Sequence, residues 1–205
     1  MNIELLEKLE KHVSEFNPPL AESMPKDPFM ILISTILSAR TRDETTARVC
    51  KELFKKVRKP IDLKKMTIKE LESIIKPVNF YKNKATYLKG LRSLKQVPST
   101  MNELLKIKGV GRKTANIVLN VAFGKSAIAV DTHVHRISNL LGLVNTKTPI
   151  ETERSLRDKL PLEWWSKINY ILVLHGQHTC KPTKQYCNTC PINNECPRTR
   201  TRQNP

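Results

Sequence analysis

Apolar residues recur at intervals of three and four along much of this chain, which is the spacing of one face of an α-helix. The first such set comprises Ile3, Leu6, Leu9, Val13 and Phe16. It predicts an amphipathic helix over residues 2–16, which Asn17-Pro18-Pro19 ends because proline cannot continue a helix. The apolar run after Asp27-Pro28 fits a buried strand or a buried helix, and the helical segments around it favour the helix.

Several helix starts are marked by capping boxes. In such a box a threonine and a glutamate three residues later accept hydrogen bonds from each other's backbone N–H groups. The pattern is found at Thr41–Glu44, Thr67–Glu70 and Thr100–Glu103. Thr148-Pro149-Ile150-Glu151 adds a proline at the first helical position, where its missing N–H costs nothing. Each of these sites predicts the start of a helix.

Turn residues predict where helices end. Asn79-Phe80-Tyr81 is expected to form a turn before a helix that runs to about Leu94. Gly124 and Gly142 are expected to end two later helices, and Gly176 to close the apolar segment Trp164–His175. The chain shows no strand pattern and no internal repeat, so the predicted fold class is all-α.

The chain is strongly basic. It has 36 Lys and Arg against 19 Asp and Glu, a formal net charge of +17 and a pI near 9.8. Such an excess is typical of a protein with a polyanionic partner, although a solvated surface or a ribosome-associated protein would also carry it. The start MNIELLEKLEKH is no secretory signal, and the longest apolar run, Phe29–Leu37, is far shorter than the roughly 20 residues of a membrane span. We expect a soluble, intracellular protein of the cytoplasm and nucleoid.

Four of the five cysteines are gathered near the end of the chain. Cys180, Cys187, Cys190 and Cys196 give the pattern C-x6-C-x2-C-x5-C, which can enclose tetrahedral zinc or an iron–sulfur cube. Zinc sites usually show two C-x-x-C pairs, and only one is present here, so the wider gaps favour the larger centre. The fifth, Cys50, lies on the apolar stripe of a predicted helix and is interpreted as a core residue.

Other residues of this region bear on the metal centre. His175 and His178 could complete a zinc site, but histidines at a helix end more often bond to backbone carbonyls. Lys181 and Lys184 lie in the loop between the first two of the four cysteines, where they could reach phosphates. A metal so late in the chain is expected to be structural. The basic tail Pro197–Pro205 follows.

A second chemical motif lies at Ile107–Lys113. Gly109 and Gly111 bracket Val110, and Arg112 and Lys113 follow at the start of an apolar-periodic helix. Glycines before a helix N-terminus let backbone N–H groups approach an anion such as a DNA phosphate. Downstream, Asp131 stands where an N-cap belongs, at the start of the next helix.

The chain resembles the endonuclease III family of helix-hairpin-helix DNA glycosylases in three motifs that follow one another in the family's order. They are LLKIKGVGRKTANIVLN (Leu104–Asn120), AIAVDTHVHR and the pattern of four cysteines. The resemblance covers about Phe29–Pro197. It implies two lobes with a DNA-binding cleft between them. One is a helical barrel over residues 19–127, with the hairpin at about 100–123; the other joins residues 1–18 to 128–205 and carries a [4Fe-4S] cluster.

The resemblance also implies roles for individual residues. Lys113 matches the family's nucleophilic lysine and Asp131 its catalytic aspartate. Gly109, Val110 and Gly111 match the phosphate-gripping hairpin, and Cys180, Cys187, Cys190 and Cys196 the cluster ligands. Ser38 and Asp43 match the segment between the family's second and third helices, and Phe80 matches its apolar wedge. Other expected DNA contacts are Arg112 and Lys184.

Three positions depart from the family pattern. Lys108 replaces the usual proline of the hairpin, which loosens the turn but adds a charge near phosphate. Arg40 stands where many members have glutamine, in the loop that reaches the gap opposite the flipped base, so the opposite-base preference is open. Leu105 replaces an acidic residue found in some members.

The function that the resemblance implies is a monomeric base-excision-repair glycosylase with abasic-site lyase activity, acting on oxidised pyrimidines in duplex DNA. Its nucleophile must be a neutral lysine amine, which desolvation or a neighbouring cation such as Arg112 favours. Two alternatives are a monofunctional mismatch glycosylase, against which Lys113 argues, and a metal-stabilised DNA-binding module without chemistry. In the latter, Lys113 only binds phosphate and Asp131 only caps a helix.

Overall fold

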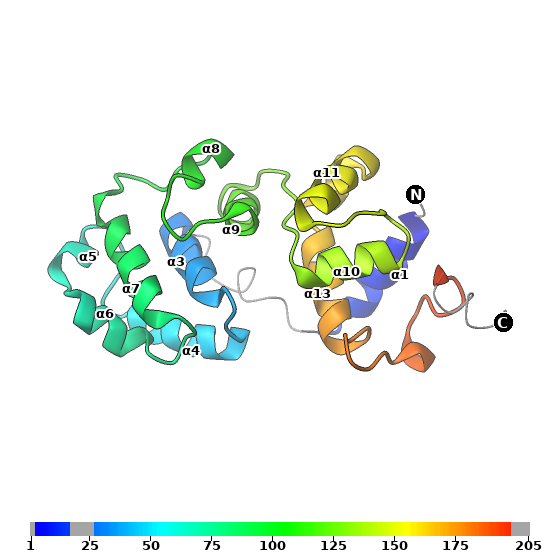
Figure 1. Ribbon diagram of the computed structural model, residues 1–205, viewed down its shortest axis with the longest axis horizontal. Coiled ribbons are helices and arrows are strands. Elements are labelled where there is room, and N and C mark those ends of the chain that lie inside the picture. The colour runs from blue at the N-terminus through cyan, green and yellow to red at the C-terminus, as the bar shows by residue number, and fades with distance from the viewer. Residues whose placement is uncertain (1–2, 17–26, 198–205) are drawn as a thin grey trace. The chain divides into compact units, whose positions relative to one another are not determined.

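The computed structural model describes residues 3–16 and 27–197, and helices make up all its regular secondary structure (Figure 1). The one strand-like feature in these ranges is an isolated bridge between Cys180 and Gln185. The predicted all-α class is therefore confirmed. The chain divides into two compact units, one of Leu20–Lys125 and one of Met1–Pro19 with Ser126–Pro205. The first helix ends at Val13, earlier than the predicted end at residue 16. Residues 17–19, the first predicted domain boundary and most of the basic tail lie outside the described residues.

The first unit is built around α3 (Pro28–Ser38), which packs against α4 (Asp43–Leu53), α7 (Tyr81–Gly90) and α9 (Arg112–Ile117) (Figure 1). The Asp27 carboxylate caps α3 by accepting from the Met30 N–H at 2.9 Å. Every residue from Ile31 to Leu37 is buried. This run is a buried helix rather than a strand, as predicted. The unit also contains α5 (Asp62–Lys65), α6 (Ile68–Ile75), a 3-10 turn (Leu91–Ser93) and α8 (Met101–Leu104).

Most of the predicted helix starts are found in the structure. Thr67 and Glu70 form the complete capping box of α6. Thr100 and Thr148 cap α8 and α11 (Pro149–Lys159) by accepting from the N–H three residues on. The box predicted at Thr41 is wrong, because α4 begins at Asp43 and the Thr41 hydroxyl instead accepts hydrogen bonds from residues distant in sequence.

The second unit is built around α13 (Ile168–His178), which packs against α1 (Ile3–Val13), α10 (Thr132–Leu140) and α12 (Leu162–Trp165). The predicted inner face of the first helix is confirmed, since Leu6, Leu9 and Val13 are buried in this core. Polar contacts also fasten α1. Lys8 Nζ lies 2.6 Å from a carboxylate oxygen of Glu195, and the Tyr170 hydroxyl lies 2.9 Å from one of Glu10.

Gly176 does not end a helix as predicted. It lies inside α13, where a Cβ atom would stand 2.5 Å from Nδ1 of His133 on α10. The glycine is required by the close packing of two helices and not by a turn. The other two predicted stops are confirmed, because Gly124 and Gly142 have φ angles of 62° and 68°.

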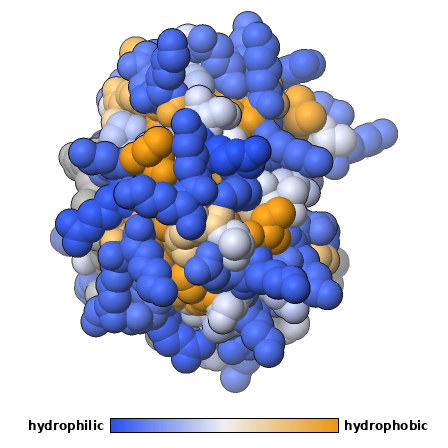
Figure 2. All heavy atoms as spheres, turned by 90° about the vertical axis from the view of Figure 1, so that its left-hand side faces the viewer, coloured by the Kyte–Doolittle hydropathy of each residue, from blue (hydrophilic) through white to orange (hydrophobic). Residues whose placement is uncertain are grey.

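One face of the molecule is mostly polar. The face shown in Figure 2 carries hydrophilic side chains over most of its area, with small separate hydrophobic areas among them. None of the helices described is long and apolar enough to cross a membrane.

Candidate active site and metal centre

The hairpin lies in the first unit, between α8 and α9. Val110 is buried with 7% exposure, and its N–H donates to the Ile107 carbonyl at 3.0 Å, which closes the turn. Gly111 is the N-cap of α9 and has no side chain with which to cap it. The helix continues from Ile117 into a π-helical turn, Val118–Ala122. The exposed residues Gly109 and Gly111 thus lie on either side of a buried, hydrogen-bonded Val110 at the start of α9.

The fold requires glycine at one of the two glycine positions of the hairpin but not at the other. Gly109 has a φ of 89°, and a Cβ atom there would lie 2.4 Å from the ring of Tyr87 on α7. Gly111 has an extended backbone and no atom within 4 Å of its virtual Cβ. Only Gly109 is thus required by the fold of the free protein, while Gly111 leaves open space in front of the helix.

This difference predicts unequal effects of alanine. We expect Gly109→Ala to lower the free energy of unfolding by about 2 kcal/mol, because it combines a left-handed backbone with a steric clash. We expect Gly111→Ala to cost less than about 1 kcal/mol. Urea unfolding of the two variants measures both values. Equal losses would contradict this account of the hairpin.

The two expected catalytic residues lie in different units. Lys113 is exposed in the first turn of α9, in the unit Leu20–Lys125. Asp131 belongs to the other unit, where its Oδ1 accepts from the Val134 N–H at 2.9 Å and caps α10. The predicted N-cap is confirmed. The segment before it is fixed by the Asn169 side chain, whose Nδ2 donates to the Ala129 carbonyl at 2.7 Å.

The other predicted DNA contacts of the first unit lie on its surface or at helix ends. Phe80 is 59% exposed, which excludes a core role, and the Arg40 guanidinium carbon lies 5.8 Å from its ring centroid. Lys108 is exposed, and so is Asp43, the first residue of α4. Ser38 ends α3 and donates to the Thr35 carbonyl at 3.0 Å. Arg112 is half-buried. Leu105, one of the three departures from the family pattern, is 41% exposed.

Sequence reasoning missed a buried lysine. Lys84 on α7 is 4% exposed, and its Nζ donates to three oxygens around the Arg40 segment. The signal was its position on the inward face beside Ala85 and Leu88. Burial lowers the pKa of Lys84 to about 8.

The cysteine side chains line one pocket in the second unit. The other lining residues include Leu140, Leu141, Ile192 and His175, while the four thiols are those of Cys180, Cys187, Cys190 and Cys196. Burial, with the neighbouring thiols adding to it, raises the pKa of Cys190 to about 11. Within the described residues, no three His, Cys, Asp or Glu side chains are grouped closely enough to hold a single metal ion. Soft thiols spread around an apolar pocket are a donor set that fits an iron–sulfur cluster.

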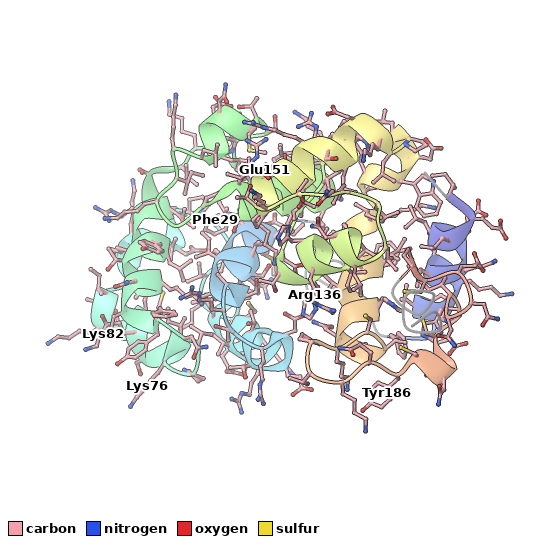
Figure 3. The ribbon with its side chains drawn as sticks, turned by 45° about the vertical axis from the view of Figure 1, so that its right-hand side comes forward. Phe29, Lys76, Lys82, Arg136, Glu151 and Tyr186 are labelled. Atoms are coloured by element: carbon pink, nitrogen blue, oxygen red, sulfur yellow. The ribbon has the colours of Figure 1, made fainter. Side chains whose placement is uncertain are left out.

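Helix α10 connects to this pocket through Arg136, whose guanidinium donates to the Cys180 carbonyl and lies 3.7 Å from its Sγ (Figure 3). His175 is buried, and burial lowers its pKa to about 4. Its Nδ1 has no hydrogen-bond partner in the part of the chain that is described, so the expected carbonyl contact is wrong for that atom. His178 stacks on Phe16, with ring centroids 4.2 Å apart.

The loop between Cys180 and Cys187 holds two lysines beside one aromatic ring. The Nζ atoms of Lys181 and Lys184 lie 5.3 and 5.1 Å from the ring centroid of Tyr186, which is labelled in Figure 3. Cation–π attraction restrains both ammonium groups. The loop therefore presents a paired positive charge.

Comparison with known proteins decides the family. The family model described as "HhH-GPD superfamily base excision DNA repair protein" matches residues 33–162. Endonuclease III of Thermotoga maritima is 48% identical over 83% of this chain and 83% of its own length. This chain belongs to the endonuclease III group of the HhH-GPD superfamily. Endonuclease III of Bacillus subtilis is 39% identical over 85% of this chain and 83% of its own length.

Two of the solved structures that match are also of endonuclease III. One, described as a trapped endonuclease III–DNA covalent intermediate, has a TM-score of 0.88 and 35% identity, covering 98% of this chain and 96% of the other. A non-covalent endonuclease III–DNA complex matches with the same TM-score and identity. Membership of the family implied by the sequence motifs is thus confirmed.

Proposed function

We propose that this protein is a bifunctional base-excision-repair enzyme, which removes oxidised pyrimidines from duplex DNA and nicks the strand 3′ to the resulting abasic site. The observation that carries the proposal is the similarity over 98% of the chain to an endonuclease III trapped covalently on DNA. Lys113, on the first turn of α9, is the amine that would form such a bond here. The enzyme is proposed to act as a monomer on DNA in the cytoplasm and nucleoid.

The first step is extrusion of the damaged nucleotide, because a base inside a duplex cannot be reached. The net charge of +17 supplies sequence-independent grip on the backbone. The backbone N–H groups of Gly109 and Gly111 bind one phosphate, with Val110 closing the turn between them. Arg112, Lys108 and the Lys181/Lys184 pair neutralise other phosphates. The exposed Phe80 enters the stack as an apolar wedge beside Arg40, with Ser38 and Asp43 supporting that segment.

The second step is displacement of the base. The neutral Nζ of Lys113 attacks C1′ of the extruded sugar, and the C1′–N bond breaks with its electron pair going to the base, which takes up a proton. Asp131, from the other unit, is proposed to act on the same nucleotide. Its carboxylate accepts the proton that Nζ loses and stabilises positive charge developing on the sugar.

The third step cuts the strand. The C1′–O4′ bond then breaks, and O4′ takes up the proton that Asp131 received. The protonated Schiff base that forms between Nζ and C1′ makes the 2′ hydrogen acidic. A base removes that proton, the C3′–O bond breaks with its electrons going to the 3′ phosphate, and water then releases Lys113 as the free amine. The products are a nicked strand, the free base and regenerated enzyme, with no outside oxidant or reductant needed.

We propose that Cys180, Cys187, Cys190 and Cys196 hold a [4Fe-4S] cluster, which is a general property of this family. When bound, the cluster supplies a cross-link for an irregular segment and takes no part in the steps above. The cross-linked segment would then include the loop of Lys181 and Lys184 and the Cys180 contact of Arg136.

Metal analysis tests the cluster. We expect purified protein to be brown and to contain about four iron atoms and four sulfides per chain, as the cube requires. Cys187→Ala should lose most of this iron. Cys50→Ala is the matched control, because Cys50 is buried in the other unit and should leave the iron content unchanged. A colourless protein with about one zinc per chain would overturn the cluster assignment.

A panel of duplexes with single lesions tests the activity. We expect release of oxidised pyrimidines followed by nicking on the 3′ side, and neither product from undamaged DNA. Base release without nicking would point to a monofunctional glycosylase, and binding without either product to a module that lacks chemistry.

A further inference from the structure

Two bulky residues of the first unit share an unusual backbone conformation. Arg40 and Phe80 have φ angles of 56° and 57°, and no other residue but glycine has a positive φ in the described ranges. Such a conformation persists in bulky residues only where the surroundings hold it. Both side chains are exposed, and the Arg40 guanidinium lies over the Phe80 ring. Two segments distant in sequence thus form one paired tip.

The buried Lys84 holds the first of these segments. Its Nζ donates to the carbonyl oxygens of Leu37 and Ala39 at 2.7 Å each, and to Oγ1 of Thr41 at 3.1 Å. The acceptors lie on both sides of Arg40 in the chain. A buried ammonium is costly unless such oxygens surround it, so the contacts fix the path of the backbone through Arg40.

The hydrogen-bond network of Lys84 also reaches the second segment, through the Thr41 hydroxyl. Phe80 is the N-cap of α7, and its carbonyl accepts from the Lys84 backbone N–H at 3.0 Å, a helix bond that does not depend on the lysine side chain. Asn79, which precedes Phe80, donates through its side chain to the Arg40 carbonyl and through its N–H to the Thr41 hydroxyl at 3.2 Å. The Thr41 hydroxyl is therefore shared between Lys84 and Asn79, and the network connects both left-handed residues.

We propose that Lys84 is a positioning residue which, through Thr41 and Asn79, holds Arg40 and Phe80 as one preformed pair for entry into the base stack. Lys84 itself touches no substrate. Capping of α3 alone would explain the contacts to Leu37 and Ala39, but not the contact to the Thr41 hydroxyl, which also accepts from Asn79 beside Phe80. A wedge already held in shape does not lose conformational freedom on insertion, so extrusion becomes easier. The inference rests on the proposed function and assigns a new residue to its first step.

The test compares two single-turnover rates with enzyme in excess. One is excision of an oxidised pyrimidine from a fully paired duplex, which requires extrusion of a stacked base. The other is Schiff-base formation at a preformed abasic site, where no base has to leave the stack. We expect Lys84→Met to lower the ratio of the first rate to the second by roughly tenfold or more, since small misplacements have such effects.

Lys89→Met is the matched control. Lys89 lies on the same helix and also donates to backbone carbonyls, those of Leu63 at 2.7 Å and Met66, away from the paired tip. Its loss should leave the ratio unchanged whatever it does to the melting temperature. Thr41→Val removes only the shared hydroxyl and should lower the ratio in the same direction, so it decides the matter if Lys84→Met does not fold.

A double variant shows through which group Lys84 acts. If Lys84 acts through the paired tip, its substitution should have no further effect once Phe80 has been replaced. The double variant Lys84→Met, Phe80→Ala should then have the same rate ratio as whichever single variant has the lower one, or a higher ratio. The inference would be overturned if the two substitutions lowered the rate ratio independently, so that the double variant showed the product of their effects. It would also be overturned if the ratio was unchanged in both Lys84→Met and Thr41→Val. A wild-type protein that forms no Schiff base at an abasic site would instead refute the proposed function.

Discussion

Replacing Lys113 with glutamine is expected to lower the rate of base excision by roughly ten-thousandfold or more, as loss of a covalent nucleophile does. Glutamine keeps the length and polarity of the side chain but has no basic amine. Because Lys113 is exposed, the free energy of unfolding should change by less than about 0.5 kcal/mol. Single-turnover excision and nicking of a lesion duplex give the rates.

Lys106→Gln is the control for the loss of one positive charge from the same hairpin, because Lys106 is exposed there too. It should weaken DNA binding slightly and leave the rate of the bound complex within about threefold, as a peripheral phosphate contact does. Equal effects of the two substitutions would mean that Lys113 acts only as a phosphate-binding cation.

Asp131 allows its two roles to be separated. Asn is as good an N-cap as Asp, so Asp131→Asn should keep the hydrogen bond to the Val134 N–H and change stability by less than about 0.5 kcal/mol. It removes the carboxylate charge, and we expect excision to fall by roughly a hundredfold or more, as loss of acid–base and charge stabilisation does. Asp131→Ala should lose both roles, and about 1 kcal/mol of stability with them.

Thermal unfolding and single-turnover excision on the two Asp131 variants measure both effects. If Asp131→Asn were as active as the wild type while Asp131→Ala was destabilised, the residue would be a helix cap and nothing more. The chemistry would then need another acceptor for the proton of Lys113.

Local rules predicted the helices well where a single short segment decides the outcome. The complete box at Thr67 and Glu70 and the aspartate cap at Asp131 depend on neighbouring backbone N–H groups. The prediction at Thr41 failed because Lys84 and Asn79 use its hydroxyl, and no local pattern reveals a partner so far along the chain. The prediction that Gly176 ends a helix failed for the same reason, because the close contact with His133 on α10 is what requires glycine there.

In the candidate site, too, the sequence identified residues fixed by local spacing and missed residues fixed by tertiary packing. Spacing identified the four cysteines and the glycines of the hairpin, because metal binding and phosphate approach need those residues at fixed intervals. It could not identify Tyr87, whose ring requires Gly109, or Lys84, because a lysine between apolar positions is ordinarily taken for a solvent-exposed side chain. These supports depend on the tertiary packing of α7.

The central claim is a covalent bond between Lys113 and the sugar of a damaged nucleotide. Borohydride reduces a Schiff base to a stable amine, so incubation with a lesion duplex and borohydride should give one cross-linked product. Protease digestion and mass spectrometry should then place the adduct on Lys113, and Lys113→Gln should give none. If the intact protein excises damaged bases and nicks the strand but is never trapped, or if the adduct maps to another residue, the account of Lys113 as the nucleophile is contradicted.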